Sequence, residues 1–169
     1  MSGVVADVPA DRGMELGLWA RRAFVTLFAL IALVALWGKF GQRDRESTVT
    51  ANDVTMTVSA PDVVRGGLYF QATVDIEASQ AIEHPRLVLG TGWVEGLQVN
   101  SIEPAASTET SRDGRVVLTY GGLEAGDRLK IWMQFQVDPT NPGHRDHGIE
   151  LDDETRPLAR IDRKLTVLP

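Results

Sequence analysis

One almost uninterrupted apolar segment lies near the start of the chain, and its pattern predicts a membrane-spanning helix. Residues 23–37 read AFVTLFALIALVALW, with no charged side chain and a single hydroxyl group. A helix of this length rises about 22 Å, which is short of the roughly 30 Å hydrocarbon layer of a bilayer. Apolar residues just upstream lengthen the segment. We therefore predict a spanning helix over residues 16–40.

Aromatic and basic side chains flank this segment as interfacial anchors would. Trp19 and Trp37 are separated by about 27 Å along a helix, and Trp is enriched at both faces of a bilayer. Arg21, Arg22 and Lys39 can extend their charged ends toward the headgroups while their stems stay in lipid. These five residues form the predicted membrane anchor, and the lipid bilayer is the predicted partner of the helix.

Two other interpretations of the segment stay open. A cleaved signal peptide also has a short apolar core behind arginines, although the following LWGKFGQR lacks the small residues of a cleavage site. A buried helix of a soluble protein is the other. An uncleaved signal anchor fits best, with residues 1–15 as a short N-terminal tail. Such tails commonly stay in the cytoplasm, so we expect a single-pass protein of the cell membrane whose C-terminal domain is extracytoplasmic.

Beyond the helix the hydrophobic pattern becomes alternating. Residues 41–52 are polar with little periodicity, and we predict a linker there. From residue 53 on, apolar side chains recur at every second position, as in β-strands with one buried and one solvated face. The inward residues of the three clearest strands are Val54, Met56 and Val58; Leu68, Phe70, Ala72, Val74 and Ile76; and Leu129, Ile131, Met133, Phe135 and Val137.

Shorter candidate strands follow the same pattern, with turn sequences between them. Two of these turns are Asp113-Gly114 and Asn141-Pro142-Gly143. The candidate strands cover residues 86–93, 96–103, 115–120, 148–153 and 158–169. About seven to nine strands, with no amphipathic helix among them, predict an all-β domain over 53–169. The expected fold is an immunoglobulin-like antiparallel β-sandwich.

Three segments of this domain resemble a known repeat. APDVVRGGLYFQATVDI, LQVNSIEP and YGGLEAGDRLKIWMQFQVDP occur in the order seen in the immunoglobulin-like repeat of many bacterial surface proteins. Val64 and Gly67 stand at that family's V-x-x-G turn, and Gly121, Leu123 and Gly126 at its G-x-L-x-x-G turn. Members are mostly spacers, adhesive or scaffolding modules, and the resemblance implies such a role here. This chain has one such domain rather than an array.

Composition narrows the choice of partner. Hydrophobic residues make up 43% of the chain and charged residues 24%, which is typical of folded proteins. Eleven basic and eighteen acidic residues follow Glu46, against six and five up to that point. An acidic domain argues against nucleic acid as a partner. The sequence contains no cysteine, which excludes disulfides, thiol catalysis and thiolate metal sites.

The segment NPGHRDHGIELDDE, residues 141–154, holds the best candidates for metal chemistry. His144, Asp146 and His147 could supply two imidazoles and a carboxylate to zinc or copper. However, positions i and i+3 share a face only on a helix, and the preceding proline and glycine favour a turn entering a strand. We therefore expect no metal, no cofactor and no catalytic residue. The alternative is an extracytoplasmic ligand- or metal-binding sensor or enzyme built on these three residues.

A large aromatic side chain falls on the solvated face of the sandwich. The alternation directs Trp132 outward, between Lys130 and Gln134. Because Trp is enriched among binding hot spots, Trp132 is a candidate partner surface, although a loop or the N-terminal segment could instead cover it. The sequence thus predicts a non-enzymatic binding or scaffolding protein. We expect it to be an accessory subunit whose partner is another membrane or envelope protein.

Overall fold

A computed structural model describes residues 11–36 and 42–169 of the chain. The chain forms two units, 1–41 and 42–169. The described part of the first is the helix α1 (Asp11–Leu36), which begins five residues before the predicted start. Its segment Gly17–Val34 is long and apolar enough to cross a membrane, a property that signal sequences share.

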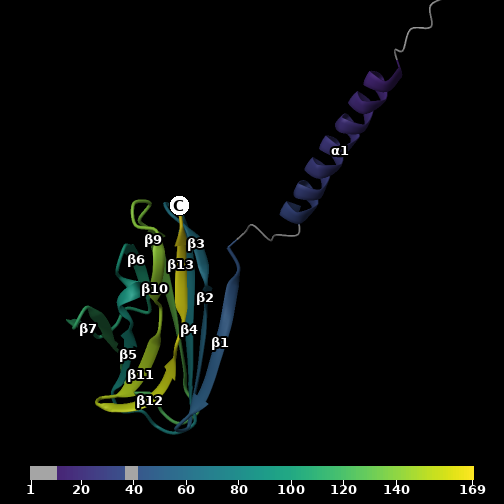
Figure 1. Cartoon of the computed structure of the whole chain (residues 1–169). Helices are drawn as coiled ribbons and strands as arrows, with labels where there is room; N and C mark the ends of the chain where they lie inside the picture. The colour runs from purple at the N-terminus through teal and green to yellow at the C-terminus, as the bar shows by residue number, and fades with distance from the viewer. Residues whose placement is uncertain (1–10, 37–41) are drawn as a thin grey trace, which may run out of the picture. The chain divides into compact units, whose positions relative to one another are not determined.

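The second unit is a two-layered β-sandwich, in which thirteen strands lie within the described residues (Figure 1). One layer is a five-stranded antiparallel sheet in the order β1-β2-β4-β9-β6. Its strands are β1 (Asp44–Ala51), β2 (Val54–Pro61), β4 (Tyr69–Ala78), β9 (Arg128–Val137) and β6 (Leu97–Glu103). The predicted all-β, immunoglobulin-like sandwich is confirmed. It has more strands than the seven to nine expected, because several are short or polar and alternate weakly.

The other layer contains two sheets, ordered β12-β11-β5-β8-β7 and β10-β13-β3. The strands of the first are β12 (Arg156–Ile161), β11 (Ile149–Asp153), β5 (Pro85–Leu89), β8 (Arg115–Thr119) and β7 (Thr108–Arg112). Those of the second are β10 (Gly143–Asp146), β13 (Lys164–Leu168) and β3 (Val63–Arg65). Only two residues separate β10 from β11, and only two separate β12 from β13. One bent hairpin therefore contributes strands to both sheets.

A single hydrophobic core lies between the layers. The inward rows predicted for β2, β4 and β9 supply much of it, and Met56, Ile76 and Phe135 are wholly buried. Leu68 is an exception, with 47% of its surface exposed. It precedes β4 and lies in the turn where its amide donates to the carbonyl of Arg65.

The predicted linker is wrong for most of its length, because residues 44–51 form strand β1. This strand pairs with β2 along its whole length, from Asp44 opposite Pro61 to Ala51 opposite Val54. Its side chains are polar and mostly exposed, so the main-chain hydrogen bonds to β2 provide most of its attachment. The sandwich consequently starts near residue 44 rather than at residue 53.

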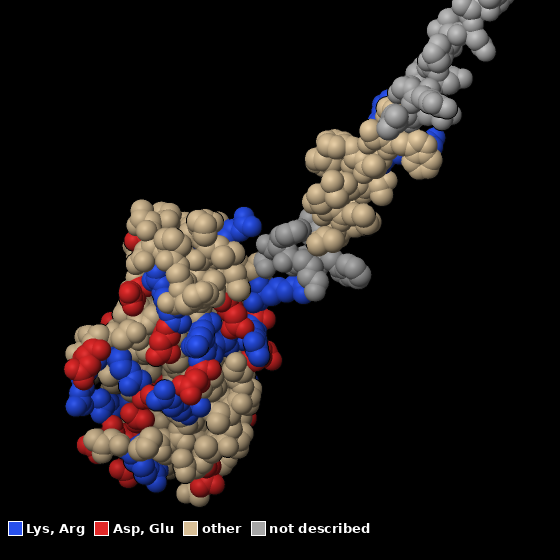
Figure 2. Space-filling view, viewed as in Figure 1, with Lys and Arg blue, Asp and Glu red and all other residues tan. Residues whose placement is uncertain are grey.

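Charge is unevenly distributed over the sandwich. Figure 2 shows basic and acidic side chains interspersed over the face that carries the bent hairpin, where Glu150 forms ion pairs with Arg115 and Arg160 at 2.8 and 2.6 Å. The end of the domain drawn uppermost, where β9 and β13 end, shows few charges in the same view. In this view the uppermost end is therefore less charged than the face that carries the bent hairpin.

A close contact between two backbone segments explains why glycine occupies position 92, within the segment GTGWVEG of residues 90–96. The short 3-10 helix η1 (Thr91–Trp93) lies directly against β10. A Cβ atom on Gly92 would be 2.2 Å from the carbonyl oxygen of Asp146, closer than atoms can pack. The contact seats the wholly buried Trp93, whose indole N–H donates to the carbonyl of Gly148 at 3.1 Å.

Replacing Gly92 with alanine is therefore expected to destabilise the sandwich. The added methyl group must push η1 away from β10, which we expect to lower the free energy of unfolding by about 2 kcal/mol. Urea unfolding of the full chain in detergent, followed by Trp fluorescence, measures the change. Gly121→Ala is the matched control, because a Cβ there meets nothing within 4 Å. Equal stabilities of the two variants would contradict the explanation.

Candidate binding surface

The structure separates the three residues of the candidate metal site. His144 and Asp146 lie on the exposed side of β10, whereas His147 points into the core. The ring of His147 stacks on Trp93, with 3.4 Å between ring centroids. The His144 ring is on the outside, where Nδ1 lies 3.0 Å from the hydroxyl of Thr166. Among the residues described, no group of three or more His, Cys, Asp or Glu side chains could hold a metal ion.

His147 is held in its neutral form. Burial, together with the nearby positive charges of Arg163 and Arg145, lowers its pKa from the usual 6.5 to about 3. Neither ring nitrogen has a hydrogen-bond partner among the described residues. The side chain therefore acts in packing, as an aromatic ring between Trp93 and Phe70.

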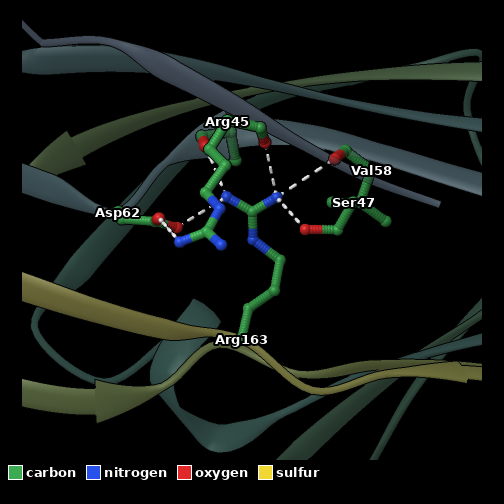
Figure 3. Close-up of polar contacts among 6 residues, drawn as sticks. Arg45, Ser47, Val58, Asp62 and Arg163 are labelled. Carbon is green, nitrogen blue, oxygen red and sulfur yellow. Dashed lines mark hydrogen bonds and ion pairs between the residues drawn. The ribbon is translucent and has the colours of Figure 1, made fainter.

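Arg163 joins the two layers of the sandwich where the hairpin bends. Its side chain is buried, and Figure 3 shows the guanidinium directed at β1 and β2. Nη1 donates to the carbonyl oxygens of Arg45 and Val58 at 2.7 and 3.0 Å. Nη2 donates to the carbonyl of Ala60 and to the carboxylate of Asp62, the latter at 2.9 Å. Arg163 is thus a structural residue that fixes β1 to the opposite layer.

The buried roles of Arg163 and His147 were not predicted, although the alternating pattern contains a signal for buried polar residues. The inward rows of the hairpin are Arg145, His147, Ile149 and Leu151 on one arm and Ile161, Arg163, Leu165 and Val167 on the other. Toward the bend, the row of Ile149 and Leu151 leads to His147. The row of Leu165 and Val167 leads to Arg163 in the same way. A polar residue on an inward row indicates a buried group that needs partners.

Trp132 lies on the outer face of the five-stranded sheet, midway along the inner strand β9. On β9 it stands between the buried residues Ile131 and Met133, and it is paired with Thr73 of β4 and Glu103 of β6. The side chain remains 42% exposed. Its outward direction agrees with the alternation in the sequence, and the exposure leaves the ring accessible rather than covered by the described chain.

Uncharged polar side chains and a second aromatic ring continue this face from Trp132 toward one end of the sheet. Register pairs Gln71 with Gln134, and Gln136 with both Tyr69 and Gln98. Tyr69, at the end of this face, is 64% exposed. We call the residues between Tyr69 and Lys130 the amide-aromatic surface. It consists of Gln71, Gln98, Trp132, Gln134 and Gln136.

An ion-pair cluster borders the amide-aromatic surface on its other side. Arg128 donates from Nε and Nη2 to the two carboxylate oxygens of Asp75, at 2.6 and 2.5 Å. These hydrogen bonds hold the pKa of Asp75 below its usual value and keep the carboxylate ionised. Lys130 lies beside both Asp75 and Trp132, with its ammonium 5.5 Å from the centroid of the indole ring. Trp132 therefore lies at the boundary between a charged and an uncharged region.

The described part of the predicted membrane anchor lies on α1. Trp19 is 69% exposed, and the guanidinium of Arg22 lies 6.0 Å from the centroid of its ring. Arg21 is exposed as well. Trp37 and Lys39 lie outside the described residues, so the anchor stays a prediction.

Comparison with known proteins yields structural similarity and no family. No family model matches the chain, and no curated protein matches it. CaCohA2 from Clostridium acetobutylicum is 12% identical, with a TM-score of 0.43 over 75% of this chain and 91% of its own. A CARDB domain from Pyrococcus furiosus is 14% identical, with a TM-score of 0.38 over 72% of this chain and 97% of its own. A glycosidase of Vibrio harveyi, a GH20 exo β-N-acetylglucosaminidase, aligns over only 18% of its length. Nothing about activity follows from these similarities, and the resemblance to bacterial surface repeats stays a prediction.

Proposed function

We propose that this chain is a non-enzymatic binding protein of a membrane or envelope complex. The helix α1 serves as a single-pass anchor in the cell membrane, and the sandwich lies outside the cytoplasm. The amide-aromatic surface binds another membrane or envelope protein. The observation that carries the proposal is the exposure of Trp132 on β9, an inner strand of its sheet.

The position of Trp132 favours binding because its backbone is rigid. β4 and β9 are inner strands of their sheet and pair over nine successive positions, from Tyr69 opposite Gln136 to Glu77 opposite Arg128. A side chain on such strands loses little backbone freedom when a partner binds. An indole ring brings a large apolar area to a contact, and the surrounding amides can both donate and accept hydrogen bonds. This combination is typical of the centre of a protein interface.

The properties of α1 support the anchor. Its 26 residues rise about 39 Å, which exceeds the roughly 30 Å hydrocarbon layer. Gly17–Val34 meets the length and composition of a membrane span. Trp19, Arg21 and Arg22 lie in the first half of the helix, as expected of an interface.

Photo-crosslinking in intact membranes tests the partner surface. A photoreactive amino acid at position 71 or 134 is expected to crosslink to one defined protein, because both positions lie on the amide-aromatic surface and Trp132 is kept. Thr110, exposed on β7 of the other layer, is the control position and is expected to give no such product. Identification of the crosslinked protein by mass spectrometry names the partner.

A substitution in the same assay measures the contribution of the indole. Trp132→Ala is expected to weaken capture of the crosslinked partner by at least about tenfold, since hot-spot tryptophans contribute about 2 kcal/mol or more. Thr110→Ala should leave capture unchanged. Undiminished capture by Trp132→Ala, or equal crosslinking at all three positions, would sink the proposed surface.

A further inference from the structure

We infer that the end of the sandwich at which β1 begins rests on the lipid bilayer, with Val63, Leu68, Tyr69 and Leu168 in contact with lipid. The inference rests on the proposed membrane anchoring by α1. It adds a second lipid contact, made by the folded domain itself, and fixes which end of the sandwich faces the membrane.

The register brings these four residues to one end. The first residue of β1, Asp44, is opposite Pro61, the last residue of β2. β3 follows at once, and its parallel pairing with β13 aligns Arg65 with Leu168. The turn after β3 is joined to Leu168, whose carbonyl accepts from the amide of Gly66. Val63, Leu68, Tyr69 and Leu168 therefore lie near the start of β1.

This end exposes an unusual amount of apolar surface. Among the described residues of the sandwich, six large hydrophobic side chains are exposed, and four of them are Val63, Leu68, Tyr69 and Leu168. Their exposed fractions are 47, 47, 64 and 40%. The same end shows few charged side chains in Figure 2. Clustered apolar surface of this kind marks a contact with a protein or a membrane.

The length of chain between α1 and β1 selects the membrane as the occupant. The helix ends at Leu36 and the strand begins at Asp44, so eight Cα-to-Cα steps join them, at most about 29 Å when fully extended. The ten-residue strands of the sandwich are about 33 Å long. A helix that spans the bilayer therefore keeps the start of β1 within about 29 Å of its own end, so this is the end of the sandwich that is tethered to the membrane. The opposite end is farther from the bilayer by up to the length of a strand.

The apolar end also carries a cation. The exposed Arg65 lies beside Leu168 and can approach lipid phosphates. Exposed acidic residues occur at both ends, among them Asp44 and Asp138 at the apolar end and Glu124 and Asp127 at the opposite end. The orientation therefore rests on the apolar residues and on the tether, not on the carboxylates.

Single-cysteine labelling tests the contact, because the chain has no cysteine of its own. Three variants of the full chain carry an environment-sensitive fluorophore: Leu68→Cys at the apolar end, Ala125→Cys on an exposed turn at the opposite end, and Leu27→Cys in α1. Each is reconstituted into phosphatidylcholine and phosphatidylglycerol vesicles. Lipids with a nitroxide quencher near the headgroup or deep in the acyl chain are then added.

The expected result is a graded pattern of quenching. The label at position 68 should be blue-shifted and lose most of its intensity to the shallow quencher, while the label at position 125 keeps the spectrum of the aqueous probe. The label at position 27 should respond most to the deep quencher. A blue shift at position 68 without lipid quenching would mean that protein covers this end, and would overturn the inference.

The controls separate this inference from the anchor on which it rests. Quenching at position 27 together with an aqueous spectrum at position 68 would overturn the lipid contact and leave the anchor intact. Loss of quenching at position 27 would overturn the anchor and the lipid contact together. Equal quenching at positions 68 and 125 would show that the domain has no preferred end, which contradicts the inference as well.

Discussion

Replacing Arg163 with methionine is expected to lower the free energy of unfolding by about 3 kcal/mol or more and to loosen β1. The guanidinium is buried and donates to the carbonyl oxygens of Arg45, Val58 and Ala60 as well as to the carboxylate of Asp62. Methionine fills a similar space but donates nothing, so those acceptors lose their partner. Breaking a buried network in this way belongs to the largest class of mutational effects.

Two measurements on the full chain in detergent separate a local from a global effect. Urea unfolding gives the change in free energy, and hydrogen exchange gives the protection of the β1 amides. Arg160→Met is the matched control, because Arg160 is 62% exposed and pairs with Glu150 and Asp162 at the surface, where an ion pair contributes at most about 1 kcal/mol. Similar losses in both variants, or unchanged exchange in β1, would contradict the role given to Arg163.

Acid is expected to destabilise the sandwich steeply because of His147. In the unfolded chain this side chain binds a proton near its ordinary pKa of 6.5, whereas in the folded protein its pKa is about 3. Between these values the unfolded state binds more protons than the folded state, so stability falls as the pH falls. The slope is about 1.4 kcal/mol per pH unit, and the full loss is complete only below about pH 3. Above pH 6.5 the contribution to stability is fully present.

Urea unfolding at a series of pH values measures this slope. His147→Leu keeps a side chain of similar volume but cannot be protonated, and it is expected to remove the slope attributed to His147. Other groups, such as the carboxylate of Asp75, still contribute below pH 4. His144→Leu alters an exposed histidine and should retain the slope of the unaltered protein. If His147→Leu lost stability between pH 6 and 4.5 as fast as the unaltered protein, the buried neutral histidine would not be its cause.

Where a strand has a fully buried face, the sequence was sufficient to predict it. The inward rows of β2, β4 and β9 alternate strictly because every second side chain must fill the core. The same rule correctly directed Trp132 outward, since its neighbours Ile131 and Met133 are wholly buried. The remainder of the amide-aromatic surface was not predictable, because Gln71 and Gln98 reach it from other strands and the register sets their position.

The pairing of strand β1 and the burial of Arg163 and His147 depend on contacts between distant parts of the chain, which local sequence patterns do not contain. β1 is an edge strand with polar side chains, and its main-chain hydrogen bonds leave no trace in the residue types. Arg163 bonds to Val58, which is 105 positions away along the chain. His147 looked like a metal ligand because imidazoles and carboxylates cluster in sequence. In space they are separated: His144 and Asp146 lie on the exposed side of β10, whereas His147, which follows the strand, points into the core.

The attachment of β1 has a mechanical consequence. Its hydrogen bonds to β2 run across the strand direction, from Asp44 opposite Pro61 to Ala51 opposite Val54. A pull on the chain at Asp44 along the strand loads all these bonds in shear at once, instead of unzipping them one after another. The guanidinium of Arg163 donates to the carbonyl of Arg45, one residue from the point where such a load would enter. A polar segment that resembles a flexible tether in sequence would therefore resist a pull as a strand loaded in shear.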